Sequence, residues 1–450
     1  MAEYLTSVGV DVGTTTTQLI LSRIRVANRA SGFAVPEMEI VDREVIYRSA
    51  IHFTPLIRDE LVDGDAIRRI VAAEYASAGI ERQDVDTGAI IITGETSRKE
   101  NAAAVLAAIS DFAGDFVVAT AGPDLESVLA AKGAGAAAYS ERTGNRVLHM
   151  DIGGGTSNLA LLEDGKVVAT ACLNVGGRLI KMDKNGIVTY RSQVLEGLTD
   201  IKPGDGLTQP KAWELARMLA RVLEMAAGLR PKEDSFYKLT TQGTQPIENV
   251  QGAVLSFSGG VAQCMGVDAD WMAYGDMGPL LAKAIRESAL CAGPYRLGEE
   301  TIRATVIGAG CHSAQLSGST VFYENVRLPI KNLPVAVLEG KPDRQAIAQA
   351  LGNLEQWGVL ALKGIESPTY SQITELADMV SDAVGVKPCY IALQADMAKA
   401  LGNALKLRMP EGTPILCIDR VVLPPQSYLD IGAPVGPALP VVVKTLILER

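Results

Sequence analysis

The stretch Gly9-Val10-Asp11-Val12-Gly13-Thr14-Thr15-Thr16-Thr17 decides how this chain can fold, because a second version of it follows as Met150-Asp151-Ile152-Gly153-Gly154-Gly155-Thr156-Ser157-Asn158. Each version has an apolar run, an aspartate, a turn of glycine and threonine, and a second run in which apolar residues alternate. This pattern predicts two β-strands joined by a tight turn. Two such hairpins could hold one phosphate chain from opposite sides, so the repeat indicates a nucleotide-dependent protein with two lobes.

The elements that follow each hairpin repeat as well. After the first hairpin we expect strands at 39–48, 88–93 and 115–119, and helices at 64–78, at 97–110 and from about Asp124. After the second we expect strands at 166–174, 252–258 and 303–308, and helices at 209–228, 278–291 and 311–317. The alternation predicts an α/β fold with two lobes built on mixed five-stranded sheets.

Three domains follow from this reading. The first lobe is expected at 1–140 and the second at 141–322, with an insertion at about 183–208. Residues 323–450 are expected to form an additional C-terminal α/β region, with strands at 334–338, 358–362, 389–393, 414–418 and 441–448 and helices at 342–356, 371–384 and 396–406. We find no chemical motif in this last region, so it is expected to pack on the second lobe or to recognise a partner.

The composition excludes several classes of function. The 450 residues are 48% hydrophobic and carry a net charge of −10, which makes nucleic acid and anionic membranes poor partners. No uncharged apolar run approaches the ~20 residues that a spanning helix needs. The N-terminus lacks the pattern of a secretory leader, so we expect a cytoplasmic protein. The six cysteines form no Cys-x-x-Cys pair and the three histidines have no metal-ligand spacing, so reduced thiols and packing roles are expected.

The paired turns have the chemistry of a phosphate site. Backbone N–H groups approach an anion closely where side chains are absent, and threonine hydroxyls add donors. The expected phosphate contacts are Gly13, Thr14, Thr15, Thr16, Gly153, Gly154, Gly155 and Thr156. Neither turn contains the lysine of a P-loop, and hairpins instead of helices follow the glycines, which excludes a Rossmann site. Taken singly, each turn is also compatible with an ordinary Asp-Gly hairpin.

The two aspartates imply a cation. Asp11 and Asp151 would repel a polyphosphate if they faced it alone, whereas Mg²⁺ accepts a few carboxylates and takes its other ligands from phosphate. We therefore predict Asp11 and Asp151 as magnesium-binding and catalytic residues. Asp11 and Asp151 could bind the ion directly or through water.

Other segments fit the same cleft. A buried strand runs into Gly259 and Gly260, where adenine and ribose could lie against the backbone, although a plain turn at a strand end is the alternative. Small-residue helices at 121–138 and 307–318 could cross between the lobes and form a hinge. We also predict that Gly308 in the second of these contacts the nucleotide.

The order phosphate loop, connector, phosphate loop, adenosine strand, connector resembles the superfamily of actin, heat-shock chaperones and sugar kinases over about residues 6–320. It implies a two-lobed actin-like ATPase with duplicated ribonuclease H-like lobes. Over nearly its whole length the chain resembles the family of ethanolamine ammonia-lyase reactivating factors. The segments that carry this are 7–17 (SVGVDVGTTTT), 91–102 (IITGETSRKENA), 121–127 (AGPDLES), 149–158 (HMDIGGGTSN), 428–432 (YLDIG) and 441–447 (VVVKTLI).

The resemblance implies an ATPase that requires ATP and Mg²⁺ and restores an adenosylcobalamin-dependent ethanolamine ammonia-lyase. The factor promotes release of damaged cobalamin from this client, and intact adenosylcobalamin then enters. It also implies ethanolamine catabolism and an association with bacterial microcompartments. Glu126 on the first connector, or Glu95, would orient the attacking water, with a helix-surface or capping role as the alternative.

Two other functions stay open at this stage. One is a small-molecule kinase on the same fold, with Asp124 as a candidate base. The other is a nucleotide-gated filament or scaffold. Assembly into a homo-oligomer is compatible with each.

Overall fold

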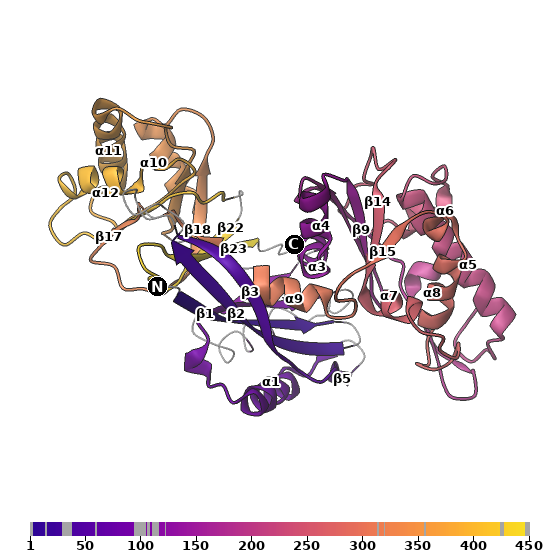
Figure 1. Cartoon of the computed structure of the whole chain (residues 1–450). Coiled ribbons are helices and arrows are strands. Elements are labelled where there is room, and N and C mark those ends of the chain that lie inside the picture. The colour runs from indigo at the N-terminus through magenta and orange to yellow at the C-terminus, as the bar shows by residue number, and fades with distance from the viewer. Residues whose placement is uncertain are drawn as a thin grey trace.

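The computed structural model describes residues 3–13, 16–28, 38–58, 61–93, 105, 109, 117–121, 123–312, 315–318, 320–354, 357–423 and 427–445. Thr14, Thr15, Glu95 and most of the helix predicted at 97–110 lie outside these residues. Figure 1 shows three α/β units along the chain, with the first lobe between the second lobe and the C-terminal region.

The first lobe is built on a mixed sheet of six strands in the order β3-β2-β1-β7-β8, with the short β4 beside β2. Its strands are β1 (Glu3–Val12), β2 (Thr16–Asn28), β3 (Met38–Arg48), β4 (His52–Phe53), β7 (Thr87–Ile92) and β8 (Val117–Ala121). Strands β1 to β3 are antiparallel neighbours, whereas β7 and β8 continue the sheet in parallel. A small hairpin of β5 (Leu56–Arg58) and β6 (Leu61–Val62) lies apart from the sheet, and the 3-10 turn η1 (Arg82–Asp84) leads into β7.

Helix α1 (Gly64–Ala78) covers one face of this sheet. It begins where Asp63 accepts a hydrogen bond from the Ala66 N–H, and it ends at Gly79 in the left-handed conformation with φ of 68°. Ile67 and Val71 on its inner side pack against alternate residues of β1 such as Val10. A polar N-cap, a C-cap glycine and an apolar stripe therefore produce the helix that the sequence predicts at 64–78.

The second lobe repeats the strand order of the first. Its five strands lie in the order β11-β10-β9-β14-β15. They are β9 (Val147–Ile152), β10 (Ser157–Glu163), β11 (Lys166–Leu173), β14 (Val254–Ser258) and β15 (Tyr295–Leu297). As in the first sheet, the first three are antiparallel and the last two are parallel additions. This duplication confirms the predicted two-lobed actin-like α/β fold class.

One predicted strand is wrong. The fifth strand of the second lobe is β15, and the run predicted as a strand at 303–308 forms helix α9 (Ala304–His312) instead. The helix predicted at 311–317 is wrong for the same reason, because α9 ends at His312 and residues 315–316 form strand β16. Residues 304–311 are apolar or small and buried on every side, so they show no period that separates a helix from a strand.

The helices of the second lobe lie on the side of its sheet that faces away from the first lobe (Figure 1). They are α5 (Gln209–Ala226), α6 (Asp234–Leu239), α7 (Gly259–Met265), α8 (Gly278–Arg286) and the 3-10 turn η4 (Ala289–Cys291). The predicted helix at 278–291 thus ends at Arg286. The expected insertion at 183–208 contains one strand of the hairpin β12 (Ile180–Met182) and β13 (Val188–Arg191), followed by the turn η3 (Gln193–Leu195).

Each of the two connector helices packs on the sheet of the other lobe. Helix α3 (Pro123–Gly133) and the following α4 (Ala136–Thr143) precede the second sheet in sequence and pack on it, for example through Ala131 against Val147. Helix α9 comes from the end of the second lobe but packs on the first sheet, where Val306 meets Ile20. The two helices cross each other at glycines. A Cβ atom at Gly133 would overlap the Ala304 carbonyl, and one at Gly308 would overlap the Leu129 carbonyl.

The C-terminal region has an eight-stranded sheet in the order β16-β23-β22-β18-β19-β20-β21-β17. The strands are β16 (Gln315–Leu316), β17 (Phe322–Glu324), β18 (Ile330–Leu338), β19 (Val359–Leu362), β20 (Cys389–Leu393), β21 (Ile415–Ile418), β22 (Ser427–Ile431) and β23 (Pro440–Thr445), and the helices are α10 (Arg344–Gly352), α11 (Tyr370–Val384) and α12 (Ala398–Lys406). The sequence reading misses β16, β17 and β22. Although β16 falls within the predicted second lobe, it pairs with β23, and the domain limits at 140 and 322 stay predictions.

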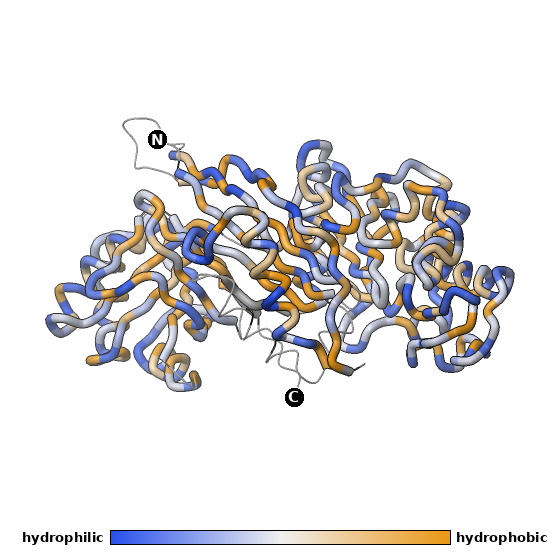
Figure 2. Tube along the Cα trace, turned by 90° about the horizontal axis from the view of Figure 1, so that it is seen from below, coloured by the Kyte–Doolittle hydropathy of each residue, from blue (hydrophilic) through white to orange (hydrophobic). Residues whose placement is uncertain are grey.

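Apolar segments run through the middle of the molecule and hydrophilic ones lie towards its edges, as Figure 2 shows from below. The C-terminal region shares a hydrophobic cluster with the first lobe, in which Ile24 and Val26 of β2 pack with Val442 of β23. The C-terminal region is therefore joined to the first lobe through a common core. No helix among the described residues is long and apolar enough to cross a membrane.

Candidate functional site

The two glycine turns close in the same way. In the first, the Gly13 N–H donates to the Thr16 carbonyl at 2.9 Å, and in the second the Gly153 N–H donates to the Thr156 carbonyl at 2.9 Å. Gly9 in β1 lets the chain pass close to α9, because a Cβ there would overlap the Val306 carbonyl. The repeat seen in the sequence is thus a repeat of backbone geometry.

The second turn presents free backbone donors. The carbonyls of Gly153 and Gly154 accept from Gly177 at 3.0 Å and from Arg178 at 2.6 Å. Within the described part of the chain, no hydrogen bond uses the N–H groups of Gly154, Gly155 or Thr156. Consecutive N–H groups without acceptors form a concave site for an anion. The arrangement is compatible with the phosphate contacts that the sequence predicts for these three residues, and these contacts stay predictions.

Asp11 stands at the end of β1, directly before the first turn. Its Oδ1 accepts a hydrogen bond from the Thr93 hydroxyl at 2.9 Å. Burial raises the pKa of Asp11 to about 7; the bond from Thr93 opposes this rise, and the negative charge of Asp151 adds to it. The two carboxylates are therefore close enough for the charge of one to affect the other.

Asp151 occupies the matching place at the end of β9 and is held by two hydroxyl groups. Ser258 donates to its Oδ1, and Thr305 donates to its Oδ2 at 3.3 Å. Burial raises the pKa of this carboxyl, whereas the two hydrogen bonds lower it. Ser258 comes from β14 and Thr305 from α9, so the second aspartate is positioned by elements that lie far away in sequence.

A buried relay continues behind Asp151. His149 bonds Ser258 through Nε2 at 2.9 Å and Ser256 through Nδ1 at 3.1 Å. Because the one hydroxyl proton of Ser258 goes to Asp151, Ser258 accepts from Nε2–H, and Nδ1 then accepts from Ser256. Burial lowers the pKa of His149 to about 3, so the ring is neutral. The histidine therefore has the hydrogen-bonding role that the sequence favours over metal ligation.

The two carboxylates fit a divalent cation. Each carboxyl is desolvated and has a raised pKa, and no basic side chain offsets the effect of burial on either one. A divalent cation bound between two such carboxylates would stabilise the ionised form of each. The donor set is oxygen only, which suits Mg²⁺. No cluster of three or more metal-ligating side chains occurs among the described residues, so further ligands would come from water or a bound ligand.

Gly259 and Gly260 lie at the start of α7, beside the second turn. Gly259 has a φ of 91°, and a Cβ there would overlap the Ile152 carbonyl of β9, so the close approach of backbone to backbone requires glycine. Gly260 is partly exposed and has open space where a side chain would stand. The predicted adenosine contact at Gly260 is sterically free, and it stays a prediction.

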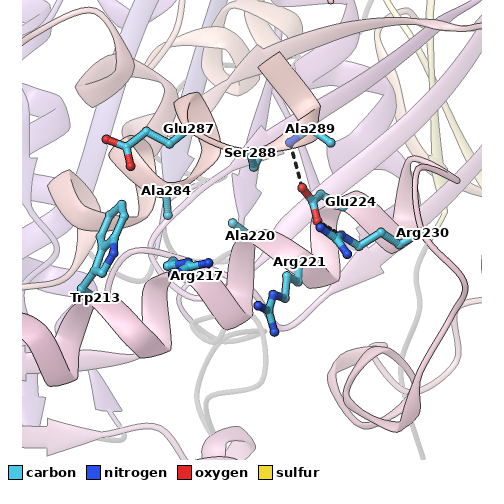
Figure 3. A pocket seen from close by; sticks show the side chains of 10 residues that line it. All are labelled: Trp213, Arg217, Ala220, Arg221, Glu224, Arg230, Ala284, Glu287, Ser288 and Ala289. Carbon is cyan, nitrogen blue, oxygen red and sulfur yellow. Dashed lines mark hydrogen bonds and ion pairs between the residues drawn. The ribbon is translucent and has the colours of Figure 1, made fainter. Parts of the chain in front are cut away.

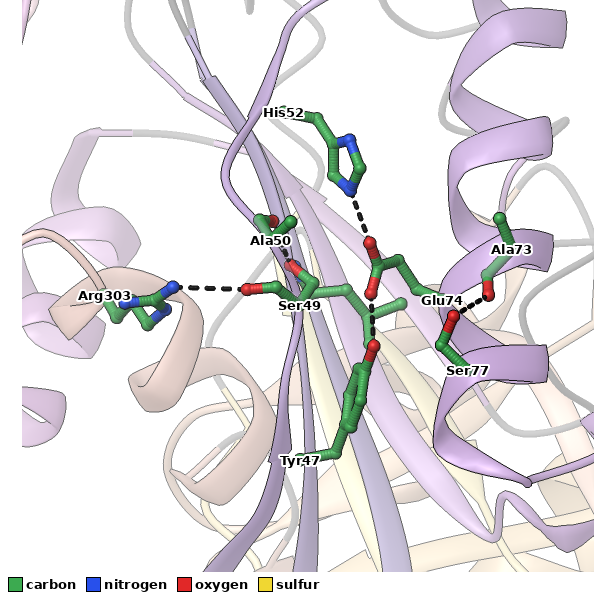
Figure 4. Close-up of polar contacts among 9 residues, drawn as sticks. Tyr47, Ser49, Ala50, His52, Ala73, Glu74, Ser77 and Arg303 are labelled. Carbon is green, nitrogen blue, oxygen red and sulfur yellow. Dashed lines mark hydrogen bonds and ion pairs between the residues drawn. The ribbon is translucent and has the colours of Figure 1, made fainter.

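The first turn is supported by a polar cluster that the sequence did not indicate. Thr54 donates to the Gly13 carbonyl at 2.7 Å. Next to it, His52 and Tyr47 both bond the carboxylate of Glu74 on α1, each at 2.5 Å (Figure 4). Glu74 is buried. The cluster fastens the β3–β4 segment, and with it Thr54, to the helix that covers the sheet.

Contacts between the lobes lie beside this cluster. Arg303, next to the start of α9, donates to the Ser49 carbonyl at 3.2 Å (Figure 4). Arg48 forms an ion pair with Glu300 at 2.8 Å. These contacts set the spacing of the lobes on the side of the first turn.

Two predicted site residues lie in the crossing connectors. Gly308 packs against the backbone of Leu129, which explains a glycine there without a ligand. Glu126 lies in the first turn of α3 and is half-buried. Asp124, the candidate base of a kinase, lies in the first turn of the same helix and accepts a hydrogen bond from the Thr170 hydroxyl at 2.6 Å. The nucleotide contact of Gly308 and the catalytic role of Glu126 stay predictions.

A separate cavity of about 290 Å³ lies between α5 and α8 at the outer end of the second lobe (Figure 3). Figure 3 shows Arg230 and the buried Glu224 paired on its wall, and Glu224 also accepts from the Ala289 N–H at 2.8 Å. This cavity includes neither glycine turn, so it is not part of the nucleotide site.

Comparison with known proteins extends the match to the whole chain. The family model for "Ethanolamine utilisation protein EutA" matches residues 3–449. The chain belongs to the EutA family. Among curated family members, the ethanolamine ammonia-lyase reactivase EutA of Salmonella typhimurium strain LT2 is 41% identical over 463 aligned positions, which cover 98% of each chain. The protein of the same name from Escherichia coli K12 is 40% identical with the same coverage.

Solved structures show weaker similarity to this member of the EutA family. The ethanolamine utilization protein EutJ from Carboxydothermus hydrogenoformans is 17% identical, with a TM-score of 0.35 over 68% of this chain and 89% of that one. An exopolyphosphatase from Cytophaga hutchinsonii is 10% identical, with a TM-score of 0.39 over 68% and 96% of the two chains. Since these scores lie below 0.5, the fold class rests on the repeated strand order.

Proposed function

We propose that this protein is an ATP- and Mg²⁺-dependent reactivating factor for adenosylcobalamin-dependent ethanolamine ammonia-lyase. The observation that supports the nucleotide part is the pair of matching glycine turns, each next to a buried aspartate, with Asp11 and Asp151 close enough for their charges to interact. The client is taken from the curated family members, which are named for reactivation of this lyase.

Different residues of the cleft would bind the phosphate groups and the cation. The N–H groups of Gly154, Gly155 and Thr156 would bind phosphate oxygens, as would the first turn at Gly13 and Thr16. Asp11 and Asp151 would hold Mg²⁺ directly or through water, while Thr93, Ser258 and Thr305 keep the carboxylates oriented. Bound Mg²⁺ would neutralise charge on the phosphate oxygens. The site thus offers positioning and electrostatic stabilisation for phosphoryl transfer to water.

Movement would arise at the crossing of α3 and α9. Helix α3 packs on the second sheet and α9 packs on the first, and the two helices touch at Gly133 and Gly308. A change in the angle between the lobes would therefore move the two helices against each other at this contact. Contacts made only to the terminal phosphate would distinguish a closed from an open form. The two forms would bind the client with different affinity, and damaged cobalamin would leave while intact adenosylcobalamin enters.

The test uses ethanolamine ammonia-lyase that has been inactivated by turnover. This protein, ATP, Mg²⁺ and free adenosylcobalamin are added, and recovery of lyase activity is followed together with phosphate release. We expect recovery only with all four components. Asp11→Asn should abolish both signals, while the matched exposed change Asp65→Asn on α1 should leave them intact.

The outcomes separate the parts of the proposal. ATP hydrolysis without recovery of the lyase would disprove the client assignment and keep the nucleotide site. Normal hydrolysis by both Asp11→Asn and Asp151→Asn would disprove the site. Phosphorylated ethanolamine among the products would identify a kinase instead. We place the activity in ethanolamine catabolism, in the cytoplasm and in association with bacterial microcompartments, as the family resemblance implies.

A further inference from the structure

A cavity of about 400 Å³ lies where the first lobe, the connector helices and the C-terminal region meet. Its walls come from the start of β3, from Lys132 on α3, from His312 at the end of α9, from residues 315–318 and from Arg420. It is distinct from the nucleotide cleft, because it contains none of the residues of the glycine turns. Three units of the molecule thus share one cavity.

Positive charge dominates the lining. The titratable side chains on the walls are three cations, one histidine and one carboxylate, namely Arg43, Lys132, Arg420, His312 and Glu39. Arg420 already forms an ion pair with Asp396 at 3.1 Å. Arg43 is fixed by a bond from its Nε to the Cys311 carbonyl at 2.7 Å, which leaves its terminal nitrogens for another acceptor.

Among the described residues, the remaining basic groups have no acidic partner. Within the part of the chain that the structure describes, neither Arg43 nor Lys132 forms an ion pair, and His312 makes no hydrogen bond. The groups are close enough to act on one another. Burial and the charge of Arg43 lower the pKa of Lys132, and burial with the charges of Arg43 and Lys132 lowers the pKa of His312 to about 3.

We infer that this cavity binds a phosphate group, either as the free ion or as the head of a small phosphomonoester. The planar fork of Arg43 suits two oxygens of one oxyanion, and the ammonium group of Lys132 supplies a second charge. The imidazole of His312 also lines the cavity and adds a third donor. A doubly charged phosphate matches the two positive charges of Arg43 and Lys132 better than a carboxylate does, because a carboxylate carries a single charge. The cavity also has room for more than one small ion, so a phosphomonoester fits.

Such a ligand would join parts of the molecule that move with the lobes. Arg43 belongs to the first sheet, Lys132 to the helix that packs on the second sheet, and His312 to the helix that crosses it. A bound anion would offset the repulsion between Arg43 and Lys132 and so stabilise the junction. The site therefore provides a place where a phosphate ligand changes the coupling between lobes without entering the nucleotide cleft.

The three histidines of the chain make a direct test feasible. In a sample labelled at histidine, only His52, His149 and His312 give side-chain NMR signals. Inorganic phosphate and, in a second arm, glycerol phosphate are titrated to roughly 20 mM, a range that detects millimolar binding. His312→Gln assigns the relevant signal. We expect the His312 signal to shift with saturation and the pKa of His312 to rise towards its ordinary value.

Variants distinguish the cavity from other phosphate sites. Lys132→Met should weaken the effect on His312 about tenfold or more, as for the loss of a charge-assisted hydrogen bond. Arg217→Ala in the outer cavity of the second lobe is the matched control and should leave the titration unchanged. The signals of His52 and His149 report that each variant is folded. Saturation by glycerol phosphate as well as by phosphate would show that the site accepts a phosphomonoester.

Three results would overturn the inference. The first is a His312 signal that does not move with either ligand. The second is a shift that Lys132→Met leaves unchanged. The third is a response of His149 alone, which would mean that phosphate binds only at the glycine turn next to Asp151.

Discussion

Asp11 and Asp151 stand at equivalent ends of β1 and β9, yet their surroundings differ. Asp11 receives one hydroxyl bond, from Thr93, whereas Asp151 receives two and is supported by the neutral His149 through Ser258. Both carboxylates are desolvated, and the charge of Asp151 also raises the pKa of Asp11. The second aspartate is therefore held by more hydrogen bonds than the first.

Asp11→Asn should stabilise the protein in the absence of nucleotide and cation. The pKa of Asp11 is about 7 in the folded chain against an ordinary 3.8, so the ionised form costs up to ~4 kcal/mol above pH 7. As the pH falls from 7 towards 4 the carboxyl becomes neutral in the folded state and then in the unfolded state, so the advantage of asparagine disappears. Thermal unfolding of both proteins between pH 4 and 8 measures this, with Asp65→Asn as an exposed control. A stability difference that does not depend on pH would contradict the prediction.

Ser258→Ala should weaken Mg²⁺–ATP binding. The change removes a bond to Asp151 and leaves the Nε2–H of His149 without an acceptor, at a cost of about 1–3 kcal/mol in stability. Ser256→Ala is the matched control, because it leaves the bond from Ser258 to Asp151 intact. Calorimetric affinities should fall clearly for Ser258→Ala and little for Ser256→Ala. Equal losses would show that the relay acts only on stability.

Among the elements, the crossing of α3 and α9 matters most for function. The glycines Gly133 and Gly308 let these helices pack with backbone against backbone, with no room for a side chain at either position. The sequence predicts that small-residue helices at 121–138 and 307–318 cross, and the structure shows the crossing between α3 and α9, although α9 spans Ala304–His312. The sequence does not indicate where α9 begins, because a short run that is buried on all sides has no polar face to mark its period.

Gly308→Ala should destabilise the protein strongly. Its new methyl group would overlap the Leu129 carbonyl, which belongs to a helix backbone and cannot rotate away, so a cost of about 1–3 kcal/mol or more is expected. Gly352→Ala at the end of α10 is the control, since that position has open space and an ordinary backbone conformation. Urea unfolding measures both. A neutral Gly308→Ala would mean that the helices are further apart than the structure places them.

At the scale of the whole molecule, the C-terminal region is coupled to the first lobe. Val442 on β23 is 1% exposed and packs in one cluster with Leu5, Ile24 and Val26 of the first sheet. Strand β16 ties the end of the second lobe to the same region by pairing with β23. The phosphate cavity proposed above lies at this junction.

Val442→Ala should therefore loosen the first lobe. Losing two buried methyl groups costs about 1–3 kcal/mol, and the cavity left behind borders β2. Amide hydrogen exchange should speed up in β2 near Ile24 as well as in β23. Val422→Ala, at a position 67% exposed, should change neither. Faster exchange confined to β22 and β23 would show that the two units unfold independently.

The sequence by itself determined the repeated hairpins, most strand positions and the fold class, because alternation of apolar residues and turn glycines are local signals. It also indicated Asp11, Asp151 and the glycines between which a nucleotide is proposed to bind. Glu126 and Gly308 are named by their place in the connectors alone, and their roles stay predictions. The proposed client rests on the names of the family members and not on any local pattern.

Only the tertiary structure decided what surrounds the aspartates. Ser258 and Thr305 reach Asp151 across 107 and 154 residues of chain, and Thr93 reaches Asp11 across 82. Isolated serines and threonines at such separations carry no signal in a sequence. The same is true of Arg43, Lys132 and His312, which line one cavity because each of the two connector helices packs on the sheet of the other lobe. Periodicity encodes which face of an element is buried, whereas the identity of the neighbour across that face depends on how the elements pack.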